Sequence, residues 1–122
     1  TYDWGEHVIA LNVVAKPAFD ICRSRQFARA ARDAGDTLTA MLLEAEWRDC
    51  ERSQRWTKAL VSLAAQHAPN QVAMAGIVAR WQPLANAAID AWCAALPALP
   101  DAAAAARNSL LALQQSCGVQ PA

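Results

Sequence analysis

The sequence predicts an all-α protein built from long antiparallel helices. The stretch from Asp36 to His67 contains no Gly or Pro and would form a helix of roughly 45–50 Å at ~1.5 Å per residue. No stretch alternates polar and apolar residues with the β-branched enrichment that is typical of strands. The connections between the predicted helices are short, and short connections make neighbouring helices antiparallel.

Five helices are expected within a single helical domain that spans residues 1–122. Their approximate ranges are 3–16, 18–33, 36–66, 70–96 and 101–116. Four of them begin beside a residue whose side-chain oxygen can accept a hydrogen bond from a free backbone N–H of the first turn. These expected N-caps are Asp3, Asp36, Asn70 and Asp101.

Three residues are expected to end or bend these helices. Pro17 should end or kink the first helix, because it lacks an N–H and disfavours helix in the residue before it. Gly35 is a natural stop for the second helix. Pro83 should bend the fourth helix, since it leaves a carbonyl one turn earlier without its usual donor.

The long helix over 36–66 carries two apolar faces. One stripe, expected to face the core, contains Leu38, Met41, Leu42, Ala45, Trp56, Ala59, Leu60 and Leu63, with Asp49 and Arg52 inside it. A second patch, roughly opposite, contains Leu43, Trp47, Cys50 and Val61. A helix with two apolar faces is usually sandwiched, either inside a larger fold or against another subunit.

The composition argues against several classes of partner. Eleven basic and eleven acidic residues balance, so no net field attracts nucleic acid or an anionic membrane. No apolar run reaches the ~20 residues that a membrane span requires, and no signal peptide is recognisable, so a cytoplasmic location is expected. Four cysteines lie far apart without a C-x-x-C pair, which favours reduced, packed thiols over disulfides or a zinc site. They are Cys22, Cys50, Cys93 and Cys117.

No catalytic, cofactor-binding or metal-ligating residue is predicted. A nucleophilic triad would have to use His7 or His67, and neither lies in a recognisable motif. A di-iron centre in a helical bundle needs inward carboxylates and Glu-x-x-His on two helices, and this motif is absent from the sequence. At the same spacing the chain has Asp49 and Arg52, and a guanidinium cannot ligate a metal.

Asp49 and Arg52 are instead predicted to form a structural ion pair. They lie one helical turn apart, so each can neutralise the other and satisfy its hydrogen bonds. The pair could be exposed to solvent on a polar helix middle. It could also be buried or interfacial, where an ion pair is costly unless both charges are fully paired.

Several segments occur in an order that is similar to a known family. They are Tyr2-Asp-Trp-Gly-Glu6, Ala10-Leu-Asn-Val-Val-Ala-Lys-Pro17, Ala34-Gly-Asp36, Arg52-Ser-Gln-Arg-Trp-Thr57 and Trp81-Gln-Pro-Leu84. Together they resemble the β subunit of the hydroxylase component of bacterial multicomponent di-iron monooxygenases, in the toluene and phenol hydroxylase branch. The resemblance covers residue 2 to about residue 96. Family β subunits are considerably longer, and the chain corresponds to their C-terminal part.

The resemblance implies a partial ferritin-like helical bundle inside a hydroxylase of α, β and usually γ subunits. In that family the α subunit holds the di-iron centre that activates O2, and the β subunit is a scaffold without iron ligands. Electrons come from NADH through a reductase, and a small effector protein tunes the reaction. No cofactor is therefore expected in this chain itself.

The first functional hypothesis is a non-catalytic structural subunit of an aromatic or hydrocarbon monooxygenase that scaffolds the iron-bearing α subunit. Its partners would be the α subunit, a γ subunit and, through the complex, the effector and the reductase. The alternatives are a free-standing helical protein that self-associates or binds another partner, and an enzyme or ligand binder with a pocket that the sequence does not reveal. An oligomer is expected, and the candidate interface residues are Trp47, Arg55, Trp56 and Trp81.

Overall fold

The computed structural model describes residues 3–96 and 99–119, and these residues form helices and no strand. The prediction of an all-α bundle of long antiparallel helices is confirmed. None of the helices formed by the described residues combines the length and the apolar character needed to cross a bilayer.

The first helices join into one continuous helical rod. It consists of α1 (Trp4–Ile9), the π-helical segment η1 (Ala10–Ala15), α2 (Lys16–Asp20), the π-helical segment η2 (Ile21–Phe27) and α3 (Ala28–Asp33). Asp3 caps the rod as predicted, because its Oδ1 accepts a hydrogen bond from the Glu6 N–H at 3.0 Å. Gly35 adopts a positive φ of 82° at the turn that follows, a conformation that glycine adopts without strain.

The expectation that Pro17 ends or kinks a helix is wrong, because the rod continues through it. Pro17 stands at the start of α2, directly after the wide turns of η1. In an α-helix its missing N–H would leave the carbonyl of Val13 without a donor. The side-chain amide of Gln114 lies 3.4 Å from that carbonyl and donates to it. A side chain from a distant part of the sequence therefore donates to a carbonyl in the turn before the proline.

The second long helix, α4 (Thr37–Ala64), runs back along the rod. Asp36 is its N-cap, and Oδ1 accepts a hydrogen bond from the Thr39 N–H at 3.0 Å. This hydrogen bond lowers the pKa of the Asp36 carboxyl below its ordinary value. A residue of the next helix caps the C-terminal end of α4, because Asn70 Nδ2 donates to the Ala64 carbonyl at 3.0 Å.

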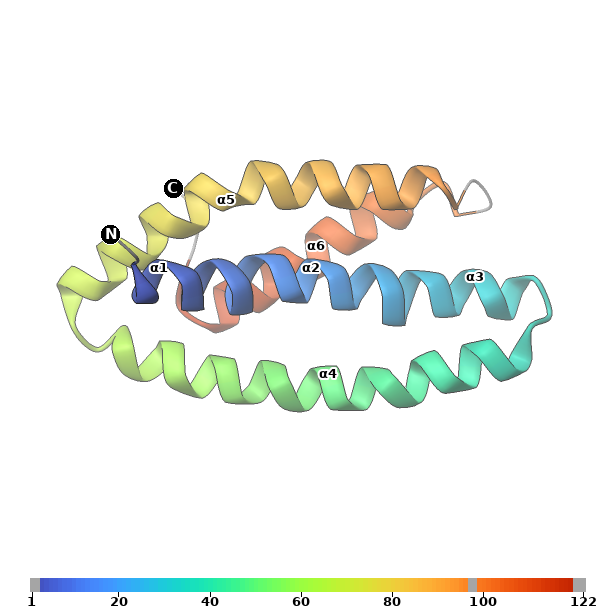
Figure 1. Cartoon of the computed structure of the whole chain (residues 1–122), viewed down its shortest axis with the longest axis horizontal. Coiled ribbons are helices and arrows are strands. Elements are labelled where there is room, and N and C mark those ends of the chain that lie inside the picture. Colours follow the sequence, from blue (N-terminus) through green and yellow to red (C-terminus); the bar gives the residue numbers. More distant parts are fainter. Residues whose placement is uncertain (1–2, 97–98, 120–122) are drawn as a thin grey trace.

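Helix α5 (Ala68–Ala94) begins earlier than expected. Its N-cap is His67, and Asn70 lies within the first turn, so the expectation that Asn70 caps this helix is wrong. The side-chain amide of Asn70 donates instead to a carbonyl in the last turn of α4. Helix α5 continues through Pro83, and its axis changes direction along its length (Figure 1). The last helix, α6 (Ala102–Ser116), starts after Asp101, whose carboxylate binds Arg29 rather than the helix N-terminus.

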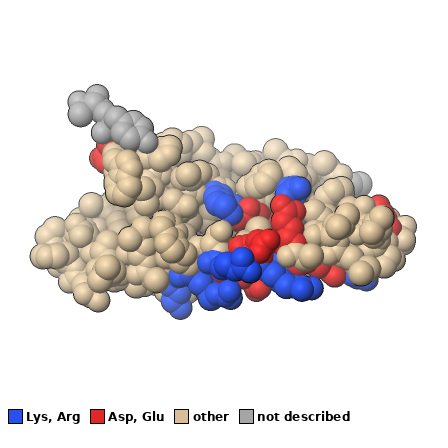
Figure 2. Space-filling model, turned by 60° about the horizontal axis from the view of Figure 1, so that its bottom comes forward, with Lys and Arg blue, Asp and Glu red and all other residues tan. Residues whose placement is uncertain are grey.

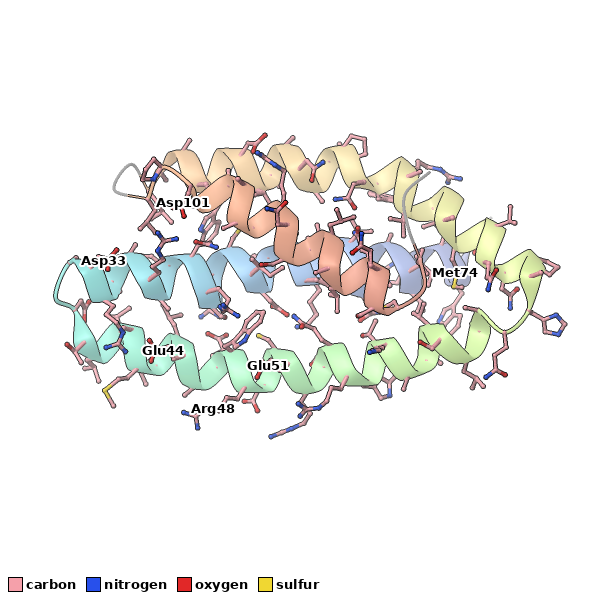
Figure 3. The ribbon with its side chains drawn as sticks, turned by 180° about the vertical axis from the view of Figure 1, so that it is seen from behind. Asp33, Glu44, Arg48, Glu51, Met74 and Asp101 are labelled. Atoms are coloured by element: carbon pink, nitrogen blue, oxygen red, sulfur yellow. The ribbon has the colours of Figure 1, made fainter. Side chains whose placement is uncertain are left out.

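The rod is the central element of the bundle. Helix α4 lies along one side of it and α5 along the other, and α6 crosses diagonally behind (Figures 1 and 3). Fully buried residues from the rod, α5 and α6 meet in the core, among them Val13, Val78, Ile89 and Leu110. Helix α4 packs almost entirely against the rod. One side of α4 is therefore left open.

Gln114 joins three of these elements and is itself completely buried. Its Nε2 donates to the Val13 carbonyl of the rod and to Oε1 of Gln82 on α5, the latter at 2.6 Å. Because both acceptors are buried or half-buried, each would be costly to leave without a donor.

We expect Gln114→Ala to lower the free energy of unfolding by about 2–4 kcal/mol, because it creates a cavity and removes both hydrogen bonds. Urea denaturation followed by circular dichroism measures this loss. The matched control is Gln115→Ala, since Gln115 is the neighbouring glutamine on the exposed side of α6. Equal effects of the two substitutions would contradict the role assigned to Gln114.

Candidate interaction surface

The face of α4 that packs on the rod is not the one expected from the sequence. The buried residues of α4 are Ala40, Leu43, Cys50, Thr57 and Val61, which belong mainly to the second, smaller patch. The stripe that was expected to face the core is exposed along its whole length, from Leu38 to Leu63. The physical reason is the pair of charges in that stripe, which would have had to be desolvated against the rod.

The Asp49–Arg52 ion pair forms on this open face. Nη1 of Arg52 lies 3.3 Å from Oδ1 of Asp49, and the side chains of Arg52 and Asp49 are 76% and 72% exposed. Burial of the pair within this chain is therefore excluded, while burial at an interface stays a prediction. A pair with this exposure contributes little to the stability of the isolated chain.

Charged side chains gather near the middle of this face, and the largest uncharged area lies at its left end in Figure 2. Arg48 extends from α4 away from the rest of the bundle (Figure 3). Some of the neighbouring charged side chains already form ion pairs within the chain. Glu44 of α4 accepts three hydrogen bonds of 2.7–3.0 Å from Arg32 of the rod. Glu46 of α4 forms an ion pair with Arg23, which also lies on the rod. These bonds fasten α4 to the rod from its edge.

The four predicted interface residues fall into different environments. Trp47 is half-buried and lies beneath the Arg25 guanidinium, 5.1 Å from the ring centroid, so its ring is already used within the chain. Arg55 and Trp56 are exposed on α4, Trp56 to 60%. Trp81 lies on α5, where its Nε1 donates to Oε1 of Glu6 at 3.0 Å. Their participation in an interface stays a prediction.

A second apolar surface lies between the rod and α5. It is an open groove of about 260 Å³. Phe19 and Trp92 meet there edge to face, with ring centroids 6.0 Å apart. Trp81 and Leu84 are the other large exposed side chains of its lining. The meeting of these residues depends on how the rod and α5 pack, which the sequence alone does not give. The lining contains no acid or base, and its one nucleophile, the Cys22 thiol, is buried with its pKa raised to about 12, so the groove offers a binding surface rather than chemistry.

The cysteines are all free and buried. Burial, together with the neighbouring Cys93, raises the pKa of the Cys22 thiol to about 12. Burial also raises the pKa values of Cys50, Cys93 and Cys117. Protonated, buried thiols are poor nucleophiles and poor metal ligands.

Comparison with known proteins places the chain in a family. Residues 1–68 match the family described as Methane/Phenol/Alkene Hydroxylase. The chain belongs to this family.

A relative in this hydroxylase family is the β subunit of the hydroxylase component of the toluene-4-monooxygenase system of Ectopseudomonas mendocina. It is 35% identical to this chain over 95 residues, which are 78% of this chain and 29% of the relative. The chain therefore spans less than a third of the length of that relative. The predicted resemblance to a hydroxylase β subunit is confirmed. The all-α bundle is consistent with a fragment of the ferritin-like hydroxylase fold.

The residues of this hydroxylase-family chain do not fit a di-iron centre. Among the described residues, no three or more His, Cys, Asp or Glu side chains come together in a way that could hold a metal ion. At the spacing of a Glu-x-x-His motif the chain has Asp49 and Arg52, which point to solvent and include a cation. No reaction step can be derived through iron bound to these residues.

We expect the unfolding free energy to fall as the pH rises above about 9, because the folded state holds Cys22 protonated. The pKa of Cys22 is higher in the folded state than its ordinary value of 9.0, so this contribution is complete below pH 9 and is lost as the pH approaches about 12. Denaturation measured at pH 8 and at about pH 10.5 should show the fall, and Cys22→Ala should make it smaller. An unchanged slope in that variant would contradict the assignment.

We expect Arg52→Ala to change the unfolding free energy of the single chain by less than ~0.5 kcal/mol, because both partners of the pair are exposed. The measurement is denaturation at the lowest usable protein concentration, where self-association does not contribute. A loss of about 3 kcal/mol would instead indicate a buried, unpaired Asp49. Arg52→Lys, which keeps the charge, is the control.

Proposed function

We propose that this chain is a non-catalytic structural subunit of β type, or part of one, in a di-iron aromatic or hydrocarbon monooxygenase, and that it scaffolds the iron-bearing α subunit. The observation that carries the proposal is the 35% identity to a hydroxylase β subunit over 78% of the chain. In such an assembly the oxygen chemistry belongs to the α subunit, and electrons arrive from NADH through the reductase. A γ subunit and an effector protein would complete the complex.

The surface of the chain supports a role in binding other subunits. Large apolar side chains remain exposed on α4, on α5 and on the rod, and exposed apolar patches of this kind mark interaction sites. The lining of the groove between the rod and α5 is apolar apart from the buried Cys22 thiol, whose raised pKa keeps it protonated and unreactive. A scaffold needs binding surfaces without chemistry, and these surfaces meet that requirement.

We assign the contact with the α subunit to the groove that contains Phe19, Trp81, Leu84 and Trp92. Its lining is apolar and aromatic, and aromatic side chains dominate the centres of stable interfaces. The groove can accept apolar side chains from a helix of a different protein, because it imposes no charge pattern on its occupant. Trp81 is already oriented at its edge by the hydrogen bond to Glu6.

The first test is recovery of the native protein from its own cell with the chain tagged. We expect the α subunit to be recovered with it in a fixed ratio, and iron to be present in proportion to that subunit. Recovery of an iron-free oligomer of this chain alone would support a free-standing protein instead. Iron bound in a fixed ratio to this chain alone would overturn the scaffold proposal.

The second test is a substitution in the groove. We expect Leu84→Asp to reduce recovery of the α subunit at least about tenfold, because it places a charge in an apolar contact. The matched control is Val72→Asp, which introduces the same charge at another exposed position of α5 outside the groove. Unchanged recovery with Leu84→Asp, in a variant with an unaltered circular dichroism spectrum, would exclude the groove as the contact.

A further inference from the structure

Two of the four buried cysteines lie in contact with each other. Cys22 belongs to the π-helical segment η2 of the rod, and Cys93 belongs to the last turn of α5. The thiol of Cys22 donates a hydrogen bond to Cys93. Both residues are part of the same core cluster, where they are 3% and 7% exposed. The contact therefore joins the rod to α5 through two sulfur atoms.

An aromatic contact beside this pair holds the rod and α5 close together at the same level. Phe19 lies about one turn before Cys22 on the rod, and Trp92 immediately precedes Cys93 on α5. The two rings meet edge to face with their centroids 6.0 Å apart. The two thiols are thus brought together by the packing of the helices as well as by their own hydrogen bond.

The other two cysteines lie in different surroundings. Sγ of Cys50 is 4.0 Å from the Ser24 hydroxyl, between α4 and the rod. Cys117 lies beside Ser116 and Lys58. Neither thiol has another cysteine among the groups that act on it. Cys50 and Cys117 therefore serve as controls of similar burial within the same chain.

Each thiol of the pair also lines an opening of its own. Cys22 lines the groove between the rod and α5, which has a volume of about 260 Å³. Cys93 lines a second opening of about 260 Å³, between Asp90 on α5 and Ala103 at the start of α6. Both openings are several times larger than the ~30 Å³ that a water molecule occupies in the liquid. A molecule as small as hydrogen peroxide can therefore reach the pair from either side.

We propose that Cys22 and Cys93 are a dithiol that hydrogen peroxide converts reversibly into an intrachain disulfide, which links the rod to α5. The proposal does not rest on the scaffold function. It also needs no face of the chain to remain uncovered by another protein, because both sulfurs belong to one chain and only a small oxidant has to reach them.

The surroundings of the two thiols assign the first step to Cys93. Burial and the charge of Asp90 raise the pKa of Cys93, while the hydrogen bond from Cys22 and the charge of Arg107 lower it. Burial and the contact with Cys93 together raise the pKa of Cys22 to about 12. Because the thiolate is the form that reacts with peroxide, Cys93 is the sulfur that is oxidised first. Cys22 is the sulfur that resolves the intermediate.

The disulfide forms in two steps. The Cys93 thiolate attacks one oxygen of the peroxide, so an S–O bond forms, the O–O bond breaks, and the leaving hydroxide takes up the proton that Cys93 gave up. The Cys22 sulfur then attacks the sulfenic sulfur, so the S–S bond forms, the S–O bond breaks, and the leaving hydroxide takes the proton of Cys22. Two thiols thereby become a disulfide and one peroxide becomes two waters. Cys22 is a poor nucleophile toward molecules in solution, but its contact with Cys93 makes the second step intramolecular.

Peptide mapping of the whole chain tests the proposal. The folded chain is treated with hydrogen peroxide, its remaining thiols are alkylated under denaturing conditions, and its tryptic peptides are analysed without reduction. Each of the four cysteines lies in a different tryptic peptide, so the partners of a disulfide can be identified directly. We expect the Cys22 peptide to be joined to the Cys93 peptide, with Cys50 and Cys117 alkylated, and dithiothreitol to restore alkylation at all four. Four alkylated cysteines after peroxide, a link to Cys50 or Cys117, or a disulfide-linked dimer in place of the intrachain link would overturn the proposal.

Matched variants separate the pair from general oxidation. Cys50→Ala/Cys117→Ala keeps the pair and should form the disulfide at the wild-type rate. Cys22→Ala removes the resolving thiol, so we expect dimedone to trap the sulfenic acid of Cys93 at least about tenfold more than in the wild type. Cys93→Ala should leave Cys22 unmodified at the same dose of peroxide. Equal trapping at Cys93 in the wild type and in Cys22→Ala, with an unaltered circular dichroism spectrum, would overturn the proposal.

Urea denaturation tests whether the disulfide fits the folded chain. The link would close a loop that contains all of α4 and most of α5, so it would restrict the unfolded chain. We expect the urea midpoint of the wild type to rise by at least about 1 M after oxidation and to return after dithiothreitol. Cys22→Ala should show no such rise. A linked chain with a lowered midpoint would mean that the folded chain has to distort to form the bond, and would also overturn the proposal.

Discussion

The bundle depends on one buried amide, the side chain of Gln114. Pro17 has no N–H to offer the carbonyls of the preceding turn, and Gln114 donates from α6 to one carbonyl of that turn, the carbonyl of Val13. The same nitrogen donates to Gln82, so the rod, α5 and α6 are fixed to one another at a single point. Helix α4 takes no part in this arrangement and packs on the rod alone. Helix α4 therefore lies at the edge of the described bundle, and the face of α4 away from the rod is exposed.

The two open surfaces differ in the partners they can select. The groove around Trp81 and Leu84 is apolar and uncharged, so it discriminates by shape and accepts any suitable apolar side chain. The exposed face of α4 carries Asp49 and Arg52 at its centre, so it discriminates by charge as well. A chain with these surfaces and without a cluster of metal-ligating side chains among its described residues can contribute to an assembly by holding other chains in place.

The sequence was sufficient for the helical class and for those features that depend on local chemistry. Asp3 and Asp36 cap helices because a nearby N–H is unpaired, whatever the rest of the fold does. The sequence was not sufficient to predict which face of α4 packs on the rod, because both faces have helical spacing and only the packing partner distinguishes them. Pro17 was misjudged for a related reason, since its compensating donor comes from a residue about a hundred positions away. The resemblance to a hydroxylase β subunit was readable because short segments carry it independently of the fold.

The charges on the exposed face of α4 restrict which partner can cover it more than they stabilise the chain. In the isolated chain the Asp49–Arg52 pair is exposed and contributes little. A partner that covers this face desolvates both charges, so it has to leave them paired or supply opposite charges of its own. An entirely apolar partner is therefore disfavoured at the centre of this face.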